Sequence, residues 1–517
     1  MNKRIFKAAS CLLLACALML SMCSCAFWQK TFAKPNKYMA YVEEEAASSA
    51  VAEFAKVYDK MLKSYSEPKA SATEGELRIG LGKSVSQILS SYTGINFDFI
   101  NDTVIKVNTD AGKDAAKYAM SLVFGKDTLL SLDTVMDTKD NGIYVKLGDI
   151  TEKYLFIDAS SAEGVDTAAI IEKLPDGEAL SALILKYIGI VFDNVNEAEK
   201  TTGEVTANGK TEECTVLEAT LSEAEVKALL KTVAFELQRD AQVENIIRAS
   251  VDVMNTLAES EKEKLDADEV YSNFVGEVNS LIADIDEDDT SDDVDEMLKY
   301  TSYVNKNSEV IARKLWVYEM GEMFIGTAYE GEEFGTEISL AYYLDESEAL
   351  SPVFEVKGEG KNVKNIVNGE FDVYADGELM LSIELSDFNN NTASKDRLIG
   401  SVNIYPSSKL FESVENSMIS AIGSSLSVGI DFSYKNGAQS IKISVKSMES
   451  ELVSFTVTGK EVNGGSVFVP AESEATDDAE AWLAEADFAK LLDTIRASEL
   501  PADIKALIES FVSMLSY

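Results

Sequence analysis

Alternation of apolar and polar residues over two long stretches, residues 75–160 and 305–470, is the feature that most constrains the fold. Within the second stretch, Val428, Ile430 and Phe432 are separated by single small or polar residues. Because successive side chains of a β-strand point to opposite faces, such a segment predicts a strand with one apolar and one polar face. The chain therefore predicts many strands and a sheet whose apolar face needs cover.

Dipeptides that favour tight turns separate many of these predicted strands. Asn or Asp followed by Gly tolerates the positive φ values of a two-residue hairpin, whereas parallel strands require a crossover of about a dozen residues or more. Phe97 and Phe99 continue the alternation in the first stretch and predict a further strand. The turn signals predict an antiparallel sheet with hairpins at Asn141-Gly142, Asn208-Gly209, Asp376-Gly377, Asn436-Gly437 and Asn463-Gly464.

Apolar residues three and four positions apart predict helices before, between and after the strand stretches. Pro35 has a backbone conformation suited to a first helical turn, and Val51 and Tyr58 lie on one face of the helix that follows. Ser222 and Glu225 have the spacing of a capping box at the start of a helical insert. The predicted helical segments are residues 51–65, 166–195, 222–300, 482–497 and 504–515.

The order of these segments predicts an α+β fold, with a large antiparallel sheet, helical inserts and helices at both ends of the chain. We expect residues 36–517 to form a single large body with strand blocks at 75–160 and 305–470, a helical insert at 222–300 and closing helices at 480–517. Two sheet domains divided near residue 300 are the alternative. A chain of 517 residues is long enough for either arrangement.

The charge balance and the missing histidine exclude several classes of function. The chain carries 89 acidic and 46 basic residues, a formal net charge of -43, so it repels phosphate and is not expected to bind nucleic acid. It contains no histidine, which removes the usual general base, a common zinc ligand and the catalytic pairs of histidine with serine or cysteine. We expect a non-enzymatic protein without a cofactor or a metal ion.

An acidic run at residues 284–296 is the segment that comes nearest to a calcium-binding loop. Asp284 and Asp286 could occupy alternate ligand positions of such a loop. Asp289 stands where the loop needs a glycine, however, and Ser291 stands where it needs an apolar residue. The run therefore predicts a solvated acidic linker.

The first 25 residues have the pattern of a secretion signal that ends in a cysteine. Positive residues lie close to the N-terminus, an apolar run spans residues 8–22, and no acidic residue occurs before Glu43. Ser24 precedes Cys25, and Met22 takes the aliphatic position three residues before that cysteine. This ending resembles the signal of bacterial lipoproteins of the Gram-positive type.

The resemblance implies that residues 1–24 are a signal peptide and that Cys25 carries a lipid anchor such as palmitate. It further implies that residues 25–35 are a tether and that the protein sits on the extracytoplasmic side of the cell membrane. An ordinary cleaved signal or an N-terminal membrane helix is the alternative. Four of the five cysteines lie in the signal, so Cys214 is the only thiol of the remaining body and no intrachain disulfide is expected there.

The body resembles two groups of lipoproteins in pattern. Its order of helices and strands resembles the half-barrel plan of lipid-carrier lipoproteins, and the segments GIYVKL from Gly142 and YLFID from Tyr154 resemble large, poorly characterised lipoproteins. The resemblance implies a curved, half-barrel-like sheet and an apolar class of ligand, and no functional residue beyond Cys25.

Two hypotheses for the function follow. The first is a membrane-anchored, non-enzymatic lipoprotein that binds a lipid or another apolar ligand. The second is an envelope scaffold or adhesion module with a fully packed core, whose protein or cell-wall partner the sequence does not identify. In the first hypothesis the candidate ligand face consists of Leu381, Ile383, Val428, Ile430, Ile441 and Ile443; in the second the same residues are core beneath helices.

Overall fold

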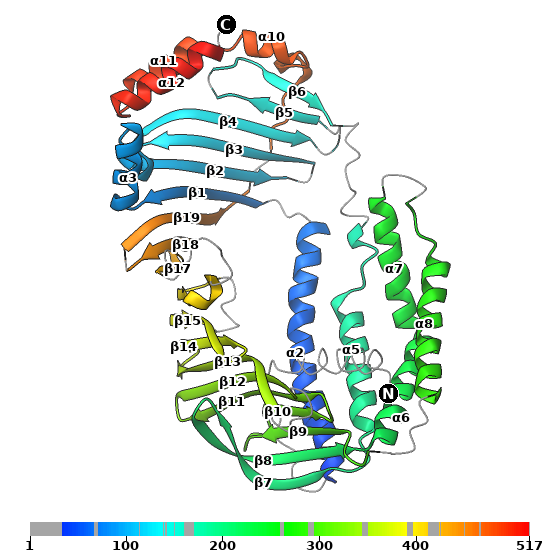
Figure 1. Ribbon diagram of the computed structural model, residues 1–517. Coiled ribbons are helices and arrows are strands. Elements are labelled where there is room, and N and C mark those ends of the chain that lie inside the picture. Colours follow the sequence, from blue (N-terminus) through cyan, green and yellow to red (C-terminus); the bar gives the residue numbers. More distant parts are fainter. Residues whose placement is uncertain are drawn as a thin grey trace. The chain divides into compact units, whose positions relative to one another are not determined.

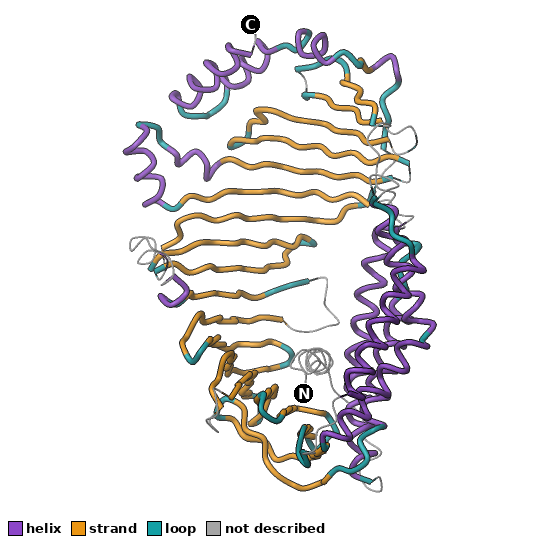
Figure 2. Tube along the Cα trace, turned by 45° about the vertical axis from the view of Figure 1, so that its right-hand side comes forward, coloured by secondary structure: helices purple, strands orange, loops and turns teal. Residues whose placement is uncertain are grey.

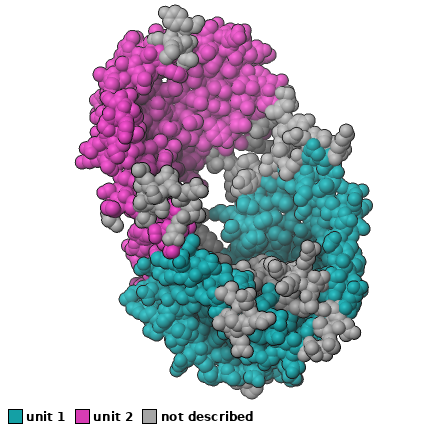
Figure 3. Space-filling view, viewed as in Figure 1, with its two compact units in different colours: residues 1–66, 165–362, 370–380 teal, residues 67–164, 363–369, 381–517 magenta. Residues whose placement is uncertain are grey.

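The computed structural model describes residues 34–66, 71–112, 114–137, 139, 142–148, 150–159, 170–258, 263–287, 294–343, 350–389, 397–411, 423, 425–448, 450–464 and 467–515. The chain forms two compact units, which Figure 3 draws in different colours. Unit 1 comprises residues 1–66, 165–362 and 370–380, and unit 2 comprises residues 67–164, 363–369 and 381–517. The units interleave along the sequence, and the number of domains stays a prediction.

Unit 1 contains an antiparallel sheet whose strands pair in chain order (Figure 1). Asn208 and Gly209 both have positive φ between the first two strands, which confirms the hairpin predicted at this dipeptide. The strands are β7 (Glu199–Ala207), β8 (Lys210–Leu221), β9 (Leu298–Val304), β10 (Val310–Val317), β11 (Gly321–Glu330), β12 (Glu333–Tyr343) and nearly all of β13 (Leu350–Val363).

The helices of unit 1 lie where the sequence predicts helical segments. Ser222 and Glu225 form the predicted capping box, since the Ser222 side chain accepts a hydrogen bond from the Glu225 amide and the Glu225 side chain accepts one from the Ser222 amide. Figure 2 shows the helices of this unit running side by side. They are α2 (Pro35–Ser66), α5 (Gly177–Asp193), α6 (Glu223–Arg239), α7 (Ala241–Leu257) and α8 (Ala267–Glu287).

Helix α2 forms the centre of the unit 1 core. The side chains of Tyr38, Met39 and Val42 are at most 1% exposed and pack among residues of α5, β8, β9 and β10. Gly177, at the start of α5, permits close packing of the two helices, because a Cβ atom there would lie only 2.8 Å from the carbonyl oxygen of Ala55 in α2. The N-terminal half of α2 is therefore a core element rather than a surface helix.

A buried ion pair fixes α2 on the unit 1 sheet. Glu43 of α2 is fully buried and accepts hydrogen bonds from Arg313 Nε of β10 at 2.9 Å, from Tyr300 Oη at 2.9 Å and from Ser302 Oγ at 2.5 Å. Burial and the neighbouring Glu43 carboxylate raise the pKa of Tyr300 well above its usual value, so the hydroxyl stays protonated and donates. Three donors thus compensate one buried carboxylate.

Cys214, the thiol expected to remain in the body, lies buried in β8. Burial, together with the nearby carboxylates of Glu212 and Glu204, raises the pKa of the Cys214 thiol to about 11. Because the thiolate is the reactive form, this cysteine is chemically inert near neutral pH.

Unit 2 contains a second, larger set of paired strands. Strand β1 pairs with β2 on one side and with β19 on the other, so the first and last strand blocks of the sequence meet there. In order of hydrogen bonding the strands are β20 (Ala475–Thr476), β6 (Tyr154–Asp158), β5 (Gly142–Lys146), β4 (Asp127–Asp137), β3 (Ala115–Phe124), β2 (Thr103–Ala111), β1 (Ser71–Leu81), β19 (Ser450–Val462), β18 (Ala438–Ser447), β17 (Leu426–Lys435), β16 (Gly400–Pro406) and β15 (Glu378–Asn389). Strand β14 (Ile366–Ala375) and strand β15 are divided between the two units.

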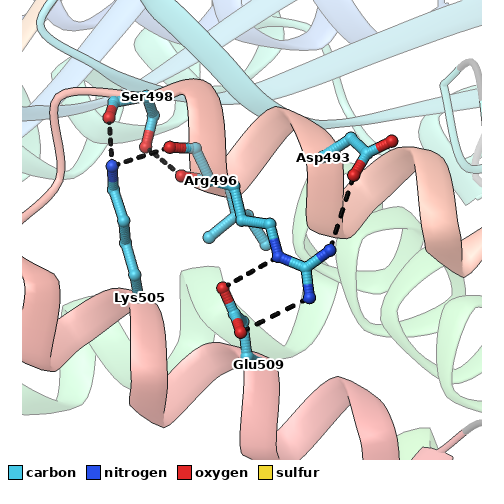
Figure 4. Close-up of polar contacts among 6 residues, drawn as sticks. Asp493, Arg496, Ser498, Lys505 and Glu509 are labelled. Atoms are coloured by element: carbon cyan, nitrogen blue, oxygen red, sulfur yellow. Dashed lines mark hydrogen bonds and ion pairs between the residues drawn. The ribbon is translucent and has the colours of Figure 1, made fainter.

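The helices of unit 2 pack at strand ends. α3 (Lys83–Thr93) contacts β19, α10 (Ala479–Ala484) contacts β6, and α11 (Phe488–Ala497) and α12 (Ala502–Leu515) pack around Phe124 and Leu129. Figure 4 shows the polar contacts of the last two helices: Arg496 Nε donates to Glu509 at 3.1 Å, and Lys505 Nζ donates to the Ser498 carbonyl oxygen at 2.5 Å. Short 3-10 helices occur at η1 (Phe97–Asp102), η3 (Ser408–Phe411) and η4 (Glu472–Glu474).

The predicted α+β class is confirmed, with mostly antiparallel strands and helices at both ends of the chain. Among the described strand pairs whose direction is defined, only β20 with β6 is parallel. The hairpins at Asp376-Gly377 and Asn436-Gly437 are confirmed by their positive φ values, whereas Asn141 lies outside the described residues.

Three local predictions are wrong. Phe97 and Phe99 belong to the 3-10 helix η1 and not to a strand, because Asn96 caps this turn by accepting a hydrogen bond from the Asp98 amide. Asn463-Gly464 follows the end of β19 and starts no hairpin. The single helix predicted at residues 482–497 is two helices, since the Asp487 side chain caps a new helix start at Phe488.

The buried pair of Glu43 and Arg313 leads to a prediction about stability. Glu43→Ala leaves the Arg313 guanidinium buried without its counter-ion, so the free energy of unfolding should fall by about 3–5 kcal/mol in urea denaturation followed by circular dichroism. Glu44→Gln, an exposed change on the same helix, is the control and should alter stability by less than about 0.5 kcal/mol. The double variant Glu43→Leu/Arg313→Met should recover most of the loss; equal instability of the single and double variants would contradict the assignment.

Candidate apolar binding face

The strand register of unit 2 brings all six predicted ligand-face residues to one side of the sheet. Ile383 of β15 lies opposite Ile404 of β16, which lies opposite Val428 of β17. Directly opposed residues of antiparallel strands point to the same face, and residues two apart in one strand share that face. Leu381 therefore joins Ile383, and Ile430 joins Val428.

The same face continues through β18. Ile430 lies opposite Ile443, and Phe432 lies opposite Ile441. We call this side of strands β15 to β19, together with the same side of β1, β2 and β3, the apolar face of unit 2. The sequence thus predicts correctly which side chains share a face, because alternation within each strand determines it.

The apolar face extends well beyond the predicted residues, across β19 and β1 into the first strand block. One row runs from Ile443 to Phe455 of β19 and Ile79 of β1. The next row runs from Ile441 through Val457, Leu77 and Ile105 to Leu122 of β3. The candidate site therefore combines strands from the two ends of the sequence.

Several side chains on this face are open to solvent. Val457 is 53% exposed, Phe455 is 44% exposed, Ile443 is 43% exposed and Met120 of β3 is 42% exposed. Single exposed apolar side chains are normal in soluble proteins, but neighbours in adjoining rows form a contiguous patch, and such patches mark binding surfaces. The arrangement can hold an apolar molecule by covering these side chains.

The opposite face of the same strands is polar, and two of its serines are buried. Ser444 and Ser454 lie opposite each other and are 1% and 4% exposed. Lys442 Nζ donates to Glu451 at 2.5 Å beside them. Burial opposes ionisation of Glu451, but hydrogen bonds from Lys442 and Ser454 outweigh it and lower the pKa of this carboxyl. Lys442 and Glu451 thus pair with each other on the side of the strands opposite to the apolar face.

A strip without side chains lies in the row next to that of Val457, on the side away from Phe455. Gly459 of β19 lies directly opposite Gly75 of β1, and Val107 of β2 follows in the same row. The Gly75 position is tight, because a Cβ atom there would lie 3.1 Å from the Val107 carbonyl oxygen. The Gly459 position is roomier, since the nearest atom to a Cβ is Thr73 Cγ2 at 3.9 Å. At the strip, β19 and β1 both lack a side chain next to Val457 and Leu77.

Other predicted sites have different outcomes. Cys25 lies outside the described residues. Asp284 and Asp286 belong to α8, where Asp286 pairs with Lys231, and residues 288–293 of the acidic run are not described. No group of three cysteine or acidic side chains within the described part of the chain is arranged to hold a metal ion.

Comparison with known proteins adds no relative. No protein-family model, curated protein or solved structure matches the chain. In the part of the chain that the structure covers, none of the helices combines the length and the apolar character needed to cross a bilayer.

Sequence analysis missed the residues of the apolar face that lie on β19, β1, β2 and β3. Each of these strands carries the alternation that identified the six predicted residues. The pairing of β1 with β19 was the missing information, because it sets which faces of the two strand blocks coincide.

The strip at Gly459 provides a test of the face by steric filling. Gly459→Leu places an apolar side chain over the strip, and the 3.9 Å distance to Thr73 leaves room for its Cβ atom. We expect urea denaturation to show a free energy of unfolding within about 1 kcal/mol of the parent protein, because a strand glycine is replaced by a residue that packs better. Gly75→Leu, at the tighter position, should lose clearly more stability; equal losses in the two variants would contradict the described geometry.

Proposed function

We propose that this protein is a non-enzymatic lipoprotein, anchored to the membrane through Cys25 on the extracytoplasmic side, whose unit 2 apolar face binds a lipid or another apolar ligand. The observation that supports the ligand is the contiguous row of half-exposed side chains Ile443, Phe455 and Ile79, next to Val457. Covering apolar surface gains roughly 25 cal/mol per Å², so an acyl chain lying over several such side chains gains several kcal/mol.

The chemistry of the two faces supports an apolar ligand rather than a charged one. The face that would contact the ligand carries aliphatic and aromatic side chains, and the ion pair of Lys442 with Glu451 lies on the other side of the strands. A net charge of -43 also disfavours a polyanionic ligand anywhere on the protein. An uncharged or zwitterionic lipid meets both conditions.

A charge placed on the apolar face tests the proposal. Val457→Glu introduces a carboxylate at a position that is already 53% exposed, so the variant can fold without burying an unpaired charge. We expect the parent protein to bind the uncharged dye N-phenyl-1-naphthylamine saturably, with a rise in dye fluorescence, and Val457→Glu to weaken this binding by about tenfold or more, which corresponds to about 1.4 kcal/mol.

The neighbouring residue supplies a matched control. Thr456 points to the opposite face, between Lys442 of β18 and Arg78 of β1, so Thr456→Glu adds the same charge next to two cations. This variant should bind the dye like the parent protein. Absence of saturable uptake by the folded parent protein, or equal loss in Val457→Glu and Thr456→Glu, would count against the proposal and favour the envelope scaffold.

The membrane anchor has its own test. Cys25→Ala removes the thiol that would carry the acyl chains, and each buried methylene contributes about 0.8 kcal/mol to membrane binding. Fractionation of cells should therefore find the variant released from the membrane or left unprocessed with its signal attached. The conservative Cys23→Ala change should leave both membrane retention and processing intact. If Cys25→Ala is retained and processed normally, the anchor lies elsewhere.

A further inference from the structure

Helix α3 presents large apolar side chains to solvent, as α12 does with Leu507 and Phe511. Ile88 is 56% exposed and Tyr92 is 87% exposed. The two residues are four positions apart, so they lie on the same face of the helix, one turn from each other. An aliphatic and an aromatic side chain therefore project together from one small surface.

The exposure of α3 is built into its attachment. Gly82 donates its backbone N–H to the Leu452 carbonyl oxygen at 2.9 Å, and it approaches β19 so closely that a Cβ atom would lie 1.8 Å from the Glu451 carbonyl oxygen. On the helix itself, Ser86 is 2% exposed and donates from Oγ to Asp98 at 2.6 Å. A backbone contact to β19 and a serine hydrogen bond to η1 thus hold α3 in place, with Ile88 and Tyr92 on its exposed side.

The segment that contains α3 lacks the acidic residues that are common elsewhere in the chain. No acidic residue occurs between Glu76 and Asp98, in a chain with 89 acidic residues. The exposed side of the helix carries Lys83 together with uncharged residues such as Gln87. This is a surface that phospholipid head groups do not repel, whereas the acidic remainder of the chain is repelled by anionic lipids.

The apolar face of unit 2 leads directly to this helix. Leu77, Ile79 and Leu81 lie on that face along β1, and α3 begins two residues after β1 ends. A molecule lying over the ends of β1 and β19 is thus close to the start of α3. The exposed pair of side chains and the proposed ligand face are continuous along the chain.

We propose that α3 is a membrane-contact element, in which Ile88 and Tyr92 enter the head-group region of a phospholipid bilayer and place the end of the apolar face against the lipid. This inference rests on the proposed lipid-binding function. Aromatic side chains with a polar end, such as tyrosine, favour the membrane interface, and a short amphipathic helix can lie in it. Two side chains bind a bilayer only weakly, but a tether to the same membrane supplies an effective concentration of about the millimolar range.

Depth-sensitive fluorescence tests the contact in the anchored protein. Protein purified from membranes, carrying Tyr92→Cys labelled with an NBD fluorophore, is reconstituted into phosphatidylcholine vesicles with a nitroxide-labelled lipid. We expect blue-shifted NBD emission that the nitroxide lipid quenches. The parent protein measures background labelling, which the buried Cys214 should keep low because burial raises its thiol pKa to about 11.

Lys435 provides the matched label position, because it is exposed at the end of β17 that lies opposite to the strand ends near α3. An NBD group at Lys435→Cys should emit like one in water and escape quenching. Unquenched NBD at position 92, in protein that stays on the vesicles, would overturn the inference. Equal quenching at both positions would overturn it as well, because the contact would then not be specific to α3.

A transfer experiment connects the contact with the ligand. Ile88→Glu/Tyr92→Glu changes the charge by the same amount as the control Lys435→Glu. The double variant should slow dye transfer from vesicles to the protein by about tenfold, yet bind free dye in solution as the parent does, and Lys435→Glu should do neither. Unchanged transfer in the double variant would overturn the inference. Failure of the parent protein to bind dye in solution would instead contradict the proposed function, while the quenching measurement would still decide whether α3 contacts the bilayer.

Discussion

The antiparallel pairing of β1 with β19 is the constraint on which unit 2 depends. Residues 72–81 pair one by one with residues 462–453, so the first strand block and the last become neighbours although most of the chain separates them. Closing so long a loop costs conformational entropy, but the cost grows only slowly with length, by roughly 0.6 kcal/mol for each doubling. A long ladder of hydrogen bonds and four opposed apolar pairs compensate for it, among them Leu77 with Val457 and Ile79 with Phe455.

Local rules explain what the sequence predicts well and where it fails. Hairpins at Asn208-Gly209 and Asn436-Gly437, the capping box at Ser222 and the common side of Val428 and Ile443 all follow from residues close together in the chain. The helix α3 escapes prediction because its few apolar residues are diluted by serine and threonine. The full extent of the apolar face escapes because no local pattern states that β1 pairs with β19.

The two faces of the unit 2 strands reverse the usual relation between polarity and exposure. Ser444 and Ser454 are buried beneath longer neighbours such as Lys442 and Glu451, while Phe455 and Val457 remain open. An open apolar patch on a soluble surface promotes self-association. The net charge of -43 opposes it, because identical acidic bodies repel one another before their patches can meet. The acidic composition therefore offsets the tendency of the exposed apolar face to cause self-association.

The deep seating of α2 has a mechanical consequence. Asn36 Nδ2 donates to the Val195 and Asn196 carbonyl oxygens, Lys37 pairs with Asp193, and Tyr38 is already fully buried, so the helix is held from its first turn. With an anchor at Cys25, residues 26–34 would reach at most about 30 Å when fully extended. A pull from the membrane would then act on a helix that is part of the unit 1 core from its first turn, instead of on a loose end. The helix would transmit force from the anchor into the buried core of unit 1.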